Sequence, residues 1–349
     1  MKKEHILIIR FSALGDVAMA VPVVYSLAMT YPHVRITVLS RGFARPFFDD
    51  LAPNVSFMEA DIKGEYRGIK GLNALYRRLV AKKPTAVADF HGVLRSTYLR
   101  MRFNMERFRV EHINKHRSGK RALTSSSDKR MVQQPTSFDN YAEVLARLGY
   151  PIKLKFSSIF GNEGGDLSLL PAAIGKRNEG EQWIGIAPFA AHKGKVYPPE
   201  MMERVIDLIE ENNPHCRIFL FGRGRDESHT FPEWCARHSH CIFVGEHLDT
   251  MRQELVLMSH LDVMVSMDSA NMHMASLTGT PVVSVWGATH PYAGFMGWNQ
   301  SEDNAVQLDL PCRPCSIFGN KPCRRGDFAC MNGIKPELIY DKINRLLSH

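Results

Sequence analysis

The chain has 349 residues, enough for about two domains of 100–200 residues each. With 44% hydrophobic, 9% aromatic and 23% charged residues, its composition is that of a folded protein and excludes the collagen-like and disordered classes. The formal net charge of +8 favours anionic partners such as phosphates, nucleic acids or an acidic membrane surface, without choosing among them.

Strand-like and helical patterns alternate through the first half of the chain. We predict helices at Val17–Thr30 and Gly71–Ala81, and strands at His5–Arg10, Arg35–Ser40, Val55–Ala60 and Thr85–Phe90. Alternation of this kind is typical of a parallel sheet covered by helices.

A second alternating region follows a break in the pattern. The helical stretch Tyr141–Leu148 ends at a Gly-Tyr-Pro turn, and residues 157–165 are polar and weakly periodic. Further strands are predicted at Trp183–Ala187, Arg217–Phe221, Ile242–Val244, Asp262–Ser266 and Val282–Trp286, with helices between them. The sequence therefore predicts two consecutive α/β domains, at residues 1–160 and 161–349.

The cysteines and the apolar runs bear on the cellular compartment. No uninterrupted apolar stretch approaches the 18 residues of a membrane span, and the N-terminal run is too short for a signal peptide. We expect a cytosolic or peripherally membrane-bound protein. Seven cysteines, an odd number, favour reduced thiols or a metal site over a disulfide framework.

Four of the cysteines gather in 19 residues near the end of the sequence, at Cys312, Cys315, Cys323 and Cys330. Four thiolates are a sufficient tetrahedral set for a structural zinc ion. Because the last two spacings do not form a second Cys-x2-Cys pair, zinc and reduced, unligated thiols fit the pattern equally well, and disulfides fit it less well.

In α/β domains, ligands bind at the carboxyl ends of strands, so polar residues just after strands are the candidate site residues. The loop Arg10–Asp16 joins the first strand to a helix, where free N–H groups and the helix dipole favour an anion. The loop is not a Walker A motif. From the residues alone, Asp16 fits a helix cap somewhat better than a functional carboxylate.

Three later segments occupy the same kind of position. Phe221–Glu227 has Glu227 where a dinucleotide fingerprint has its third glycine, which disfavours a dehydrogenase; this carboxylate could bind a ribose diol or interact with a helix dipole. Ser266–His273 offers N–H groups to a diphosphate. Lys195 could offset charge on a leaving phosphate, although most lysines are solvated surface charges.

The basic character is local. Between Arg95 and Arg130, 11 Lys and Arg against 3 Asp and Glu give an excess of +8. A solvated face, a nucleic-acid surface, and a site for an anionic sugar or lipid acceptor all fit this segment. Since no helix-turn-helix, zinc-finger or RNP signature accompanies it, we expect no nucleic-acid partner.

Taken together, three motifs resemble the family 9 glycosyltransferases, the ADP-heptose:lipopolysaccharide heptosyltransferases. They are RFSALGDVAMAVP at 10–22, ADFHGVLRS at 88–96 and SMDSANMHMA at 266–275, and WGATHP at 286–291 extends the match. The terminal cysteine cluster resembles that of the heptosyltransferase II branch. The resemblance implies a GT-B architecture, two Rossmann-like domains facing a cleft, with the acceptor on the N-terminal side and the nucleotide sugar on the C-terminal side.

The resemblance also implies roles for individual residues in an inverting transfer that needs no metal. Asp16 matches the general base and Lys195 the lysine that stabilises the departing diphosphate. Residues implied for the donor are Glu227, Leu248, Asp268, Ser269, Ala270, Asn271 and His273, and those for the anionic acceptor are His91, Arg95 and Arg121. A helix start stabilises a carboxylate and weakens it as a base, so catalysis would depend on positioning.

The expected function is thus transfer of heptose from ADP-heptose to the lipopolysaccharide inner core, at the cytoplasmic face of the inner membrane. Ala190 and Ala191 stand where relatives often carry hydroxyl residues, and residues 269–271 replace a commoner Thr-Gly-Leu. These departures leave open another donor sugar. A non-catalytic nucleotide-sugar sensor and a nucleic-acid-binding protein are the alternatives outside this enzyme class.

Overall fold

The computed structural model describes residues 4–348, which divide into two compact units. The first unit comprises Met1–Lys115 and Pro135–Ile159, and the second comprises His116–Gln134 and Phe160–His349. The sequence-based division at residue 160 placed residues 116–134 in the first domain, so the structure differs there. The segment belongs to the second unit because its backbone and lysines bind that unit, for example through the Gln134 N–H, which donates to the Tyr292 carbonyl at 2.9 Å.

The first unit is built on a five-stranded parallel sheet in the order β3-β2-β1-β4-β5. Its strands are β1 (His5–Ile9), β2 (Arg35–Ser40), β3 (Val55–Glu59), β4 (Ala86–Asp89) and β5 (Arg109–His112). Every residue of β1 and β4 is buried, as expected for central strands with helices on both faces. The parallel sheet predicted from the alternating pattern is confirmed.

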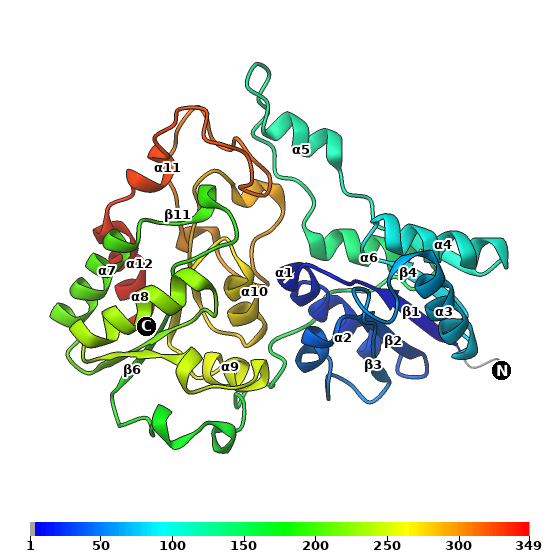
Figure 1. Ribbon diagram of the computed structural model, residues 1–349, viewed down its shortest axis with the longest axis horizontal. Helices are drawn as coiled ribbons and strands as arrows, with labels where there is room; N and C mark the ends of the chain where they lie inside the picture. Colours follow the sequence, from blue (N-terminus) through cyan, green and yellow to red (C-terminus); the bar gives the residue numbers. More distant parts are fainter. Residues whose placement is uncertain (1–3, 349) are drawn as a thin grey trace. The chain divides into compact units, whose positions relative to one another are not determined.

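Helices of the first unit connect these strands (Figure 1). They are α1 (Leu14–Ala18), α2 (Val21–Thr30), α3 (Gly68–Ala81), α4 (Leu94–Met105) and α6 (Ser137–Arg147), with a 3-10 helix at Gly42–Phe47. The prediction of a single helix at Val17–Thr30 is wrong at its start, because α1 and α2 are separate helices. Two helices are present because Pro22, in the first turn of α2, cannot donate a hydrogen bond to a continuous preceding turn.

The second unit contains a six-stranded parallel sheet in the order β11-β10-β9-β6-β7-β8. Its strands are β6 (Gln182–Ala187), β7 (Cys216–Leu220), β8 (Cys241–Phe243), β9 (Val263–Met267), β10 (Val282–Val285) and β11 (Ala305–Val306). Its helices are α5 (Arg117–Leu123), α7 (Pro199–Asn212), α8 (Arg225–Arg237), α9 (Met251–Met258), α10 (Ala270–Leu277), α11 (Ala329–Asn332) and α12 (Pro336–Leu347).

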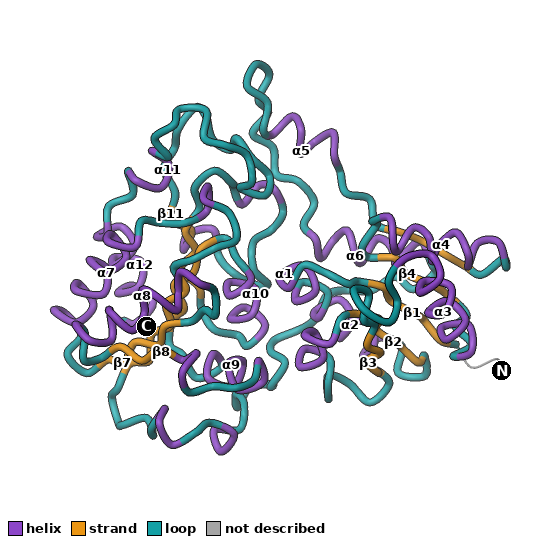
Figure 2. Tube along the Cα trace, viewed as in Figure 1, coloured by secondary structure: helices purple, strands orange, loops and turns teal. Residues whose placement is uncertain are grey.

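Short 3-10 helices and one long loop complete this unit. The 3-10 helices lie at Leu167–Leu169, Ala172–Ile174, Lys193–Lys195, Val244–Glu246, Pro291–Ala293 and Glu302–Asn304. Residues 307–328, between β11 and α11, form no helix or strand (Figure 2). This loop contains three of the four clustered cysteines.

Each sheet reverses its strand order beside a central strand, β1 in the first unit and β6 in the second. Ligands of open α/β sheets bind outside the carboxyl ends of the strands at such points. The loops after β1 and β4 in the first unit, and after β6, β7 and β9 in the second, are therefore the places to look for a site. Among residues 4–348, no helix combines the length and apolar character needed to cross a membrane.

Candidate functional site

Asp16 lies just after β1, as the third residue of α1. Its Oδ2 accepts a hydrogen bond from the backbone N–H of Ala13 at 3.2 Å and forms an ion pair with an Arg10 guanidinium nitrogen at 2.7 Å. The Asp16 side chain is 35% exposed, whereas that of Arg10 is 8% exposed. Asp16 therefore caps the helix and also presents an ionised carboxylate to solvent.

Arg10 makes two further contacts that fix its position. It donates to the carbonyl of Phe90 at 2.7 Å and lies 5.8 Å from the centre of the Tyr141 ring. The Tyr141 hydroxyl in turn donates to the backbone carbonyl of Asp16 at 3.1 Å. Burial would lower the pKa of Arg10, but Tyr141 and Asp16 outweigh it and raise that pKa above its ordinary value. The carboxylate thus faces a permanent cation of fixed orientation.

The loop after β4 is held by Asp89, a fully buried carboxylate. Its Oδ1 accepts the N–H groups of His91 and Gly92, each at 2.9 Å, and its Oδ2 lies 3.6 Å from Arg100. Gly92 has φ +59°, which favours glycine in this tight turn. The turn delivers His91 and the exposed Arg95, near the start of α4, to the same sheet edge as Asp16.

His91 is neutral at physiological pH. It is 7% exposed, and its Nδ1 accepts the N–H of Phe11 at 3.4 Å. Burial, followed by the charge of Arg10, lowers the pKa of His91 to about 3. His91 therefore offers a neutral hydrogen-bonding ring to a ligand, and Arg95 is an exposed cation in the same part of the site.

In the second unit, Lys195 and Asp268 form an ion pair. Lys195 ends the 3-10 helix after β6, and Asp268 follows β9, the neighbouring strand. The Lys195 Nζ lies 2.8 Å from the Asp268 Oδ2, with the two side chains 15% and 4% exposed. Gly319, at φ +74°, packs against the lysine stem, since a Cβ there would lie 2.6 Å from the Lys195 Cγ.

The turn after β9 leads from Asp268 into α10. Ser269 is the N-cap residue, with its hydroxyl 3.2 Å from the Ser266 hydroxyl, and Ala270 is the first helical residue. The first-turn N–H groups of Ala270 and Asn271 have no partner within the helix by its geometry, which suits a diphosphate. His273, 8% exposed, lies in the same turn.

Glu227 lies in the first turn of α8, after β7. The loop before it depends on Gly222, at φ +154°, because a Cβ there would lie 2.5 Å from the Glu227 Cγ. Leu248 is only 1% exposed, and its carbonyl accepts a hydrogen bond from Arg223. Leu248 therefore contributes mainly packing in this structure and offers little side-chain surface to a base.

Arg121 belongs to a different unit from the other two residues expected to bind the acceptor. His91 and Arg95 belong to the first unit, but Arg121 is an exposed residue of α5 in the second. The expectation that all three lie in the N-terminal domain is wrong. The physical reason lies in neighbours of Arg121: the Lys120 ammonium sits 4.2 Å from the centre of the Phe295 ring, and Lys129 donates to the carbonyl of Arg313 at 2.8 Å.

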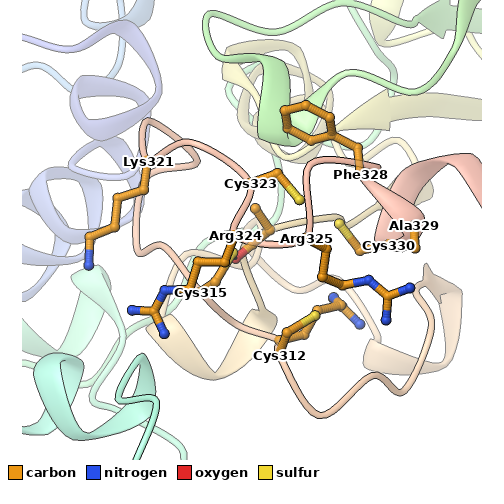
Figure 3. A pocket seen from close by; sticks show the side chains of 11 residues that line it. Cys312, Cys315, Lys321, Cys323, Arg324, Arg325, Phe328, Ala329 and Cys330 are labelled. Carbon is orange, nitrogen blue, oxygen red and sulfur yellow. The ribbon is translucent and has the colours of Figure 1, made fainter.

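The four clustered cysteines, Cys312, Cys315, Cys323 and Cys330, line one small pocket together with Arg313, Lys321, Arg324 and Arg325 (Figure 3). Burial raises the pKa of Cys330 to about 11 and also raises that of Cys315. Burial opposes ionisation of Cys323 too, but backbone N–H groups outweigh it and lower the pKa of that thiol.

The cluster meets one requirement of a metal site and not another. All seven cysteines are free thiols, and four soft ligands around one pocket have the right chemistry for zinc. Within residues 4–348, however, no three His, Cys, Asp or Glu side chains are grouped closely enough to hold a metal ion. Loading of the site would require the cysteine loop to draw its sulfurs together.

Comparison with known proteins decides the family. The model of "Glycosyltransferase family 9 (heptosyltransferase)" matches residues 72–322, more than half of the chain. The chain belongs to glycosyltransferase family 9. This family 9 protein is 21% identical over 292 residues to the lipopolysaccharide core heptosyltransferase OpsX of Haemophilus influenzae, covering 82% of this chain and 80% of that relative. It is 29% identical over 85 residues to lipooligosaccharide heptosyltransferase 2 of Campylobacter jejuni, a match spanning 24% of this chain and 26% of that relative.

Solved structures share the fold of this family 9 protein. A family 9 glycosyl transferase from Veillonella parvula has a TM-score of 0.74 at 17% identity, covering 100% of this chain and 98% of the other. The ADP-heptose LPS heptosyltransferase II of E. coli has a TM-score of 0.70 at 17% identity, covering 99% and 98%. The GT-B architecture predicted from the motifs, with two parallel α/β sheets, is confirmed.

Sequence reasoning missed three residues of this family 9 protein that support the site. Arg10 and Tyr141 orient Asp16, and Gly319 makes room for Lys195. A basic residue directly after a buried strand was a usable signal for Arg10, since a charge at that depth needs a partner. Nothing in the sequence pairs Tyr141 with Asp16 or Gly319 with Lys195, because these contacts join distant parts of the chain.

Proposed function

We propose that the protein is an inverting glycosyltransferase that moves heptose from ADP-heptose to the lipopolysaccharide inner core. The observation that carries the proposal is the partly exposed Asp16 carboxylate, oriented by a buried Arg10, in the helix that follows the central strand of a family 9 fold. The Lys195–Asp268 pair at the carboxyl ends of β6 and β9 supports it, since a lysine held there suits a leaving diphosphate.

The proposed reaction is a single displacement at the anomeric carbon. Asp16 accepts the proton of an acceptor hydroxyl as the hydroxyl oxygen bonds to the anomeric carbon from the face opposite the diphosphate. The bond from that carbon to the diphosphate oxygen breaks, and ADP leaves with the electron pair. Lys195 neutralises the charge on the diphosphate, the first-turn N–H groups of Ala270 and Asn271 bind it, and Glu227 binds the ribose. No metal ion takes part in a step.

Binding of the acceptor is assigned to its negative charges. Arg95 and Arg121 would pair with carboxylates or phosphates of the core sugars, and His91 would donate or accept a neutral hydrogen bond. The relatives named above act, by their names, on lipopolysaccharide or lipooligosaccharide. A lipid-linked acceptor of this kind would place the enzyme at the cytoplasmic face of the inner membrane as a peripheral protein.

Calorimetric binding of ADP, GDP and UDP tests the donor assignment. We expect ADP to bind at least about tenfold more tightly than GDP or UDP, because the proposed donor, ADP-heptose, carries an adenine nucleotide. A turnover assay with ADP-heptose and deacylated core oligosaccharide should then yield a product of inverted anomeric configuration. Preference for GDP or UDP would indicate a different nucleotide sugar as donor, in line with the departures from the family pattern at Ala190 and Ala191. Absence of binding to all three would favour the nucleic-acid-binding alternative, and binding without turnover would favour the sensor.

We also propose that the four clustered cysteines hold a structural metal ion, zinc being the first candidate. Elemental analysis of the purified protein should find about one zinc ion per chain. Cys315→Ser should lose the ion, while Cys235→Ser, a partly buried cysteine outside the cluster, should keep it. A metal content far below one per chain, with seven titratable thiols in denaturant, would instead support reduced, unligated cysteines.

A further inference from the structure

The outer face of helix α4 is a row of exposed apolar side chains. Leu94 is 90% exposed, Met101 is 56% exposed and Met105 is 76% exposed. Met101 and Met105 lie seven and eleven positions after Leu94, which is about two and three turns of an α-helix. The three side chains therefore form one stripe along the helix. Leu99 and Phe103, on the opposite side of α4, are fully buried against the unit. The stripe is therefore not part of the core.

Helix α3 extends this surface. The Tyr98 hydroxyl donates to the Asn73 Oδ1 at 2.9 Å, which places α3 beside α4 in the first unit (Figure 1). Ile69, one turn before Asn73, is 67% exposed. Four large apolar side chains of one unit thus face solvent on two adjacent helices. Soluble proteins rarely expose apolar groups in such a row without a partner.

The charges on the two helices are all of one sign. Helices α3 and α4 contain no Asp or Glu, and their basic residues are Lys70, Arg77, Arg78, Arg95, Arg100 and Arg102. Arg100 is turned inward to Asp89, and Arg102 covers the Tyr76 ring. Lys70, Arg77 and Arg95 remain exposed around the apolar row. Glu106, which follows Met105 at the end of α4, is one exposed carboxylate at this surface, and the exposed cations of the two helices outnumber it. An apolar row with an excess of cations around it complements an anionic lipid surface, where methylenes contact the acyl region and cations contact the headgroups.

We propose that the outer face of α3 and α4, defined by Ile69, Leu94, Met101 and Met105, docks the protein on an anionic membrane. This inference deepens the proposed function, which sets the enzyme at a membrane without naming the surface that contacts it. The placement is consistent with chemistry at Asp16, because α4 begins at the carboxyl end of β4, beside the strand that delivers Asp16. A lipid-anchored acceptor would then meet the enzyme on the side that carries His91 and Arg95.

Flotation of the full chain with lipid vesicles tests the docking surface. Wild type should float with phosphatidylcholine vesicles containing about 30% phosphatidylglycerol, and at least about tenfold less with pure phosphatidylcholine or at about 0.5 M salt. Met101→Ser with Met105→Ser should lower partitioning about tenfold or more, because two apolar side chains no longer enter the bilayer. Leu94→Ser should lower it independently.

The matched control is Met29→Ser with Met131→Ser, which removes two methionines of 58% and 44% exposure that belong to neither α3 nor α4. It should float like wild type, within about twofold. Failure of wild type to float, or equal losses in both double variants, would overturn the proposal. So would a wild-type dimer that the Met101/Met105 variant dissociates, since that outcome assigns the face to a second copy of the chain.

Two measurements separate this inference from the proposed function. Nucleotide binding, and transfer to water-soluble deacylated core oligosaccharide, should be unchanged in the Met101/Met105 variant, because neither residue belongs to the proposed site. Loss of flotation with retained transfer supports the docking surface. Flotation without nucleotide binding in wild type would contradict the proposed function and leave the docking surface supported.

Discussion

Replacing Asp16 with asparagine should lower the rate of glycosyl transfer by about a thousandfold or more, while the Kd for ADP changes by about threefold or less. The amide has nearly the shape of the carboxylate and can still accept hydrogen bonds from Arg10 and the Ala13 N–H, but it cannot take a proton. Donor affinity should persist because the residues proposed to bind the nucleotide belong to the second unit. Single-turnover transfer at saturating donor, with calorimetry for ADP, provides both readings.

The chain offers a matched control for the capping role of Asp16. Asp139 is also the third residue of its helix, α6, and accepts the N–H of Thr136 at 3.0 Å, as Asp16 accepts that of Ala13 at 3.2 Å. In both positions asparagine keeps an acceptor oxygen but removes the negative charge at the helix start, which costs about 0.3–1 kcal/mol of stability. Asp139→Asn should therefore lower stability about as much as Asp16→Asn does and leave transfer within about twofold of wild type.

Two outcomes would contradict the role of Asp16 as base. If folded Asp16→Asn retains turnover, the carboxylate serves only as a cap and a counter-ion of Arg10. If Asp139→Asn loses activity to the same degree, the loss in Asp16→Asn reflects helix stability. His91 adds no inflection to a pH–rate profile between pH 5 and 9, because its pKa of about 3 keeps it neutral throughout that range. An inflection lost with Asp16 would thus report the carboxylate or its acceptor.

Much of the fold could be predicted because burial dictates the pattern. Central strands such as β1 and β9 are buried at every position and read as continuous apolar runs between turns. Helix α4 and strand β5 were missed because residues 94–112 are rich in arginine and expose apolar side chains. Their apolar residues therefore follow neither the helical nor the strand periodicity clearly. The same exposure that hides α4 from pattern analysis makes its outer face a candidate docking surface.

The candidate site could be located from sequence but not assembled. Asp16, Lys195 and Asp268 were singled out because each lies in the segment that follows a strand in the middle of a sheet. The ion pair of Lys195 with Asp268 forms because β6 and β9 are neighbours in the sheet, and strand order cannot be predicted from local sequence patterns. Likewise, residues 116–134 lie in the sequence between two segments of the first unit but belong to the second. This assignment depends on contacts with distant parts of the chain, which composition does not reveal.

Replacing Lys195 with alanine should weaken ADP binding about tenfold to a hundredfold and lower transfer by a further hundredfold to a thousandfold. Both effects follow from its position at the proposed diphosphate site. The ammonium attracts the bound nucleotide, and it does so more strongly as negative charge grows on the leaving oxygen. Asp268 orients the ammonium at 2.8 Å, and Gly319 leaves room for its stem, so little reorganisation is needed. Calorimetry and single-turnover rates separate the two losses.

The variant has a second consequence, which a simple activity assay would confuse with the first. Asp268, 4% exposed, loses its cation in Lys195→Ala, and an uncompensated buried carboxylate lowers stability by a few kcal/mol and repels a diphosphate. The double variant Lys195→Ala with Asp268→Asn removes that charge. It should recover most of the stability and part of the ADP affinity, but not the transfer rate.

Lys193→Ala is the matched control, because this exposed lysine lies two residues away in the same turn and forms no ion pair with Asp268. It should bind ADP and transfer sugar within about twofold of wild type. Near-normal transfer by the double variant would show that Lys195 serves only to neutralise Asp268. Equal losses in Lys193→Ala and Lys195→Ala would instead assign the effect to the general positive charge of the turn. Only a loss confined to Lys195, and not repaired by Asp268→Asn, supports a lysine that acts on the departing diphosphate.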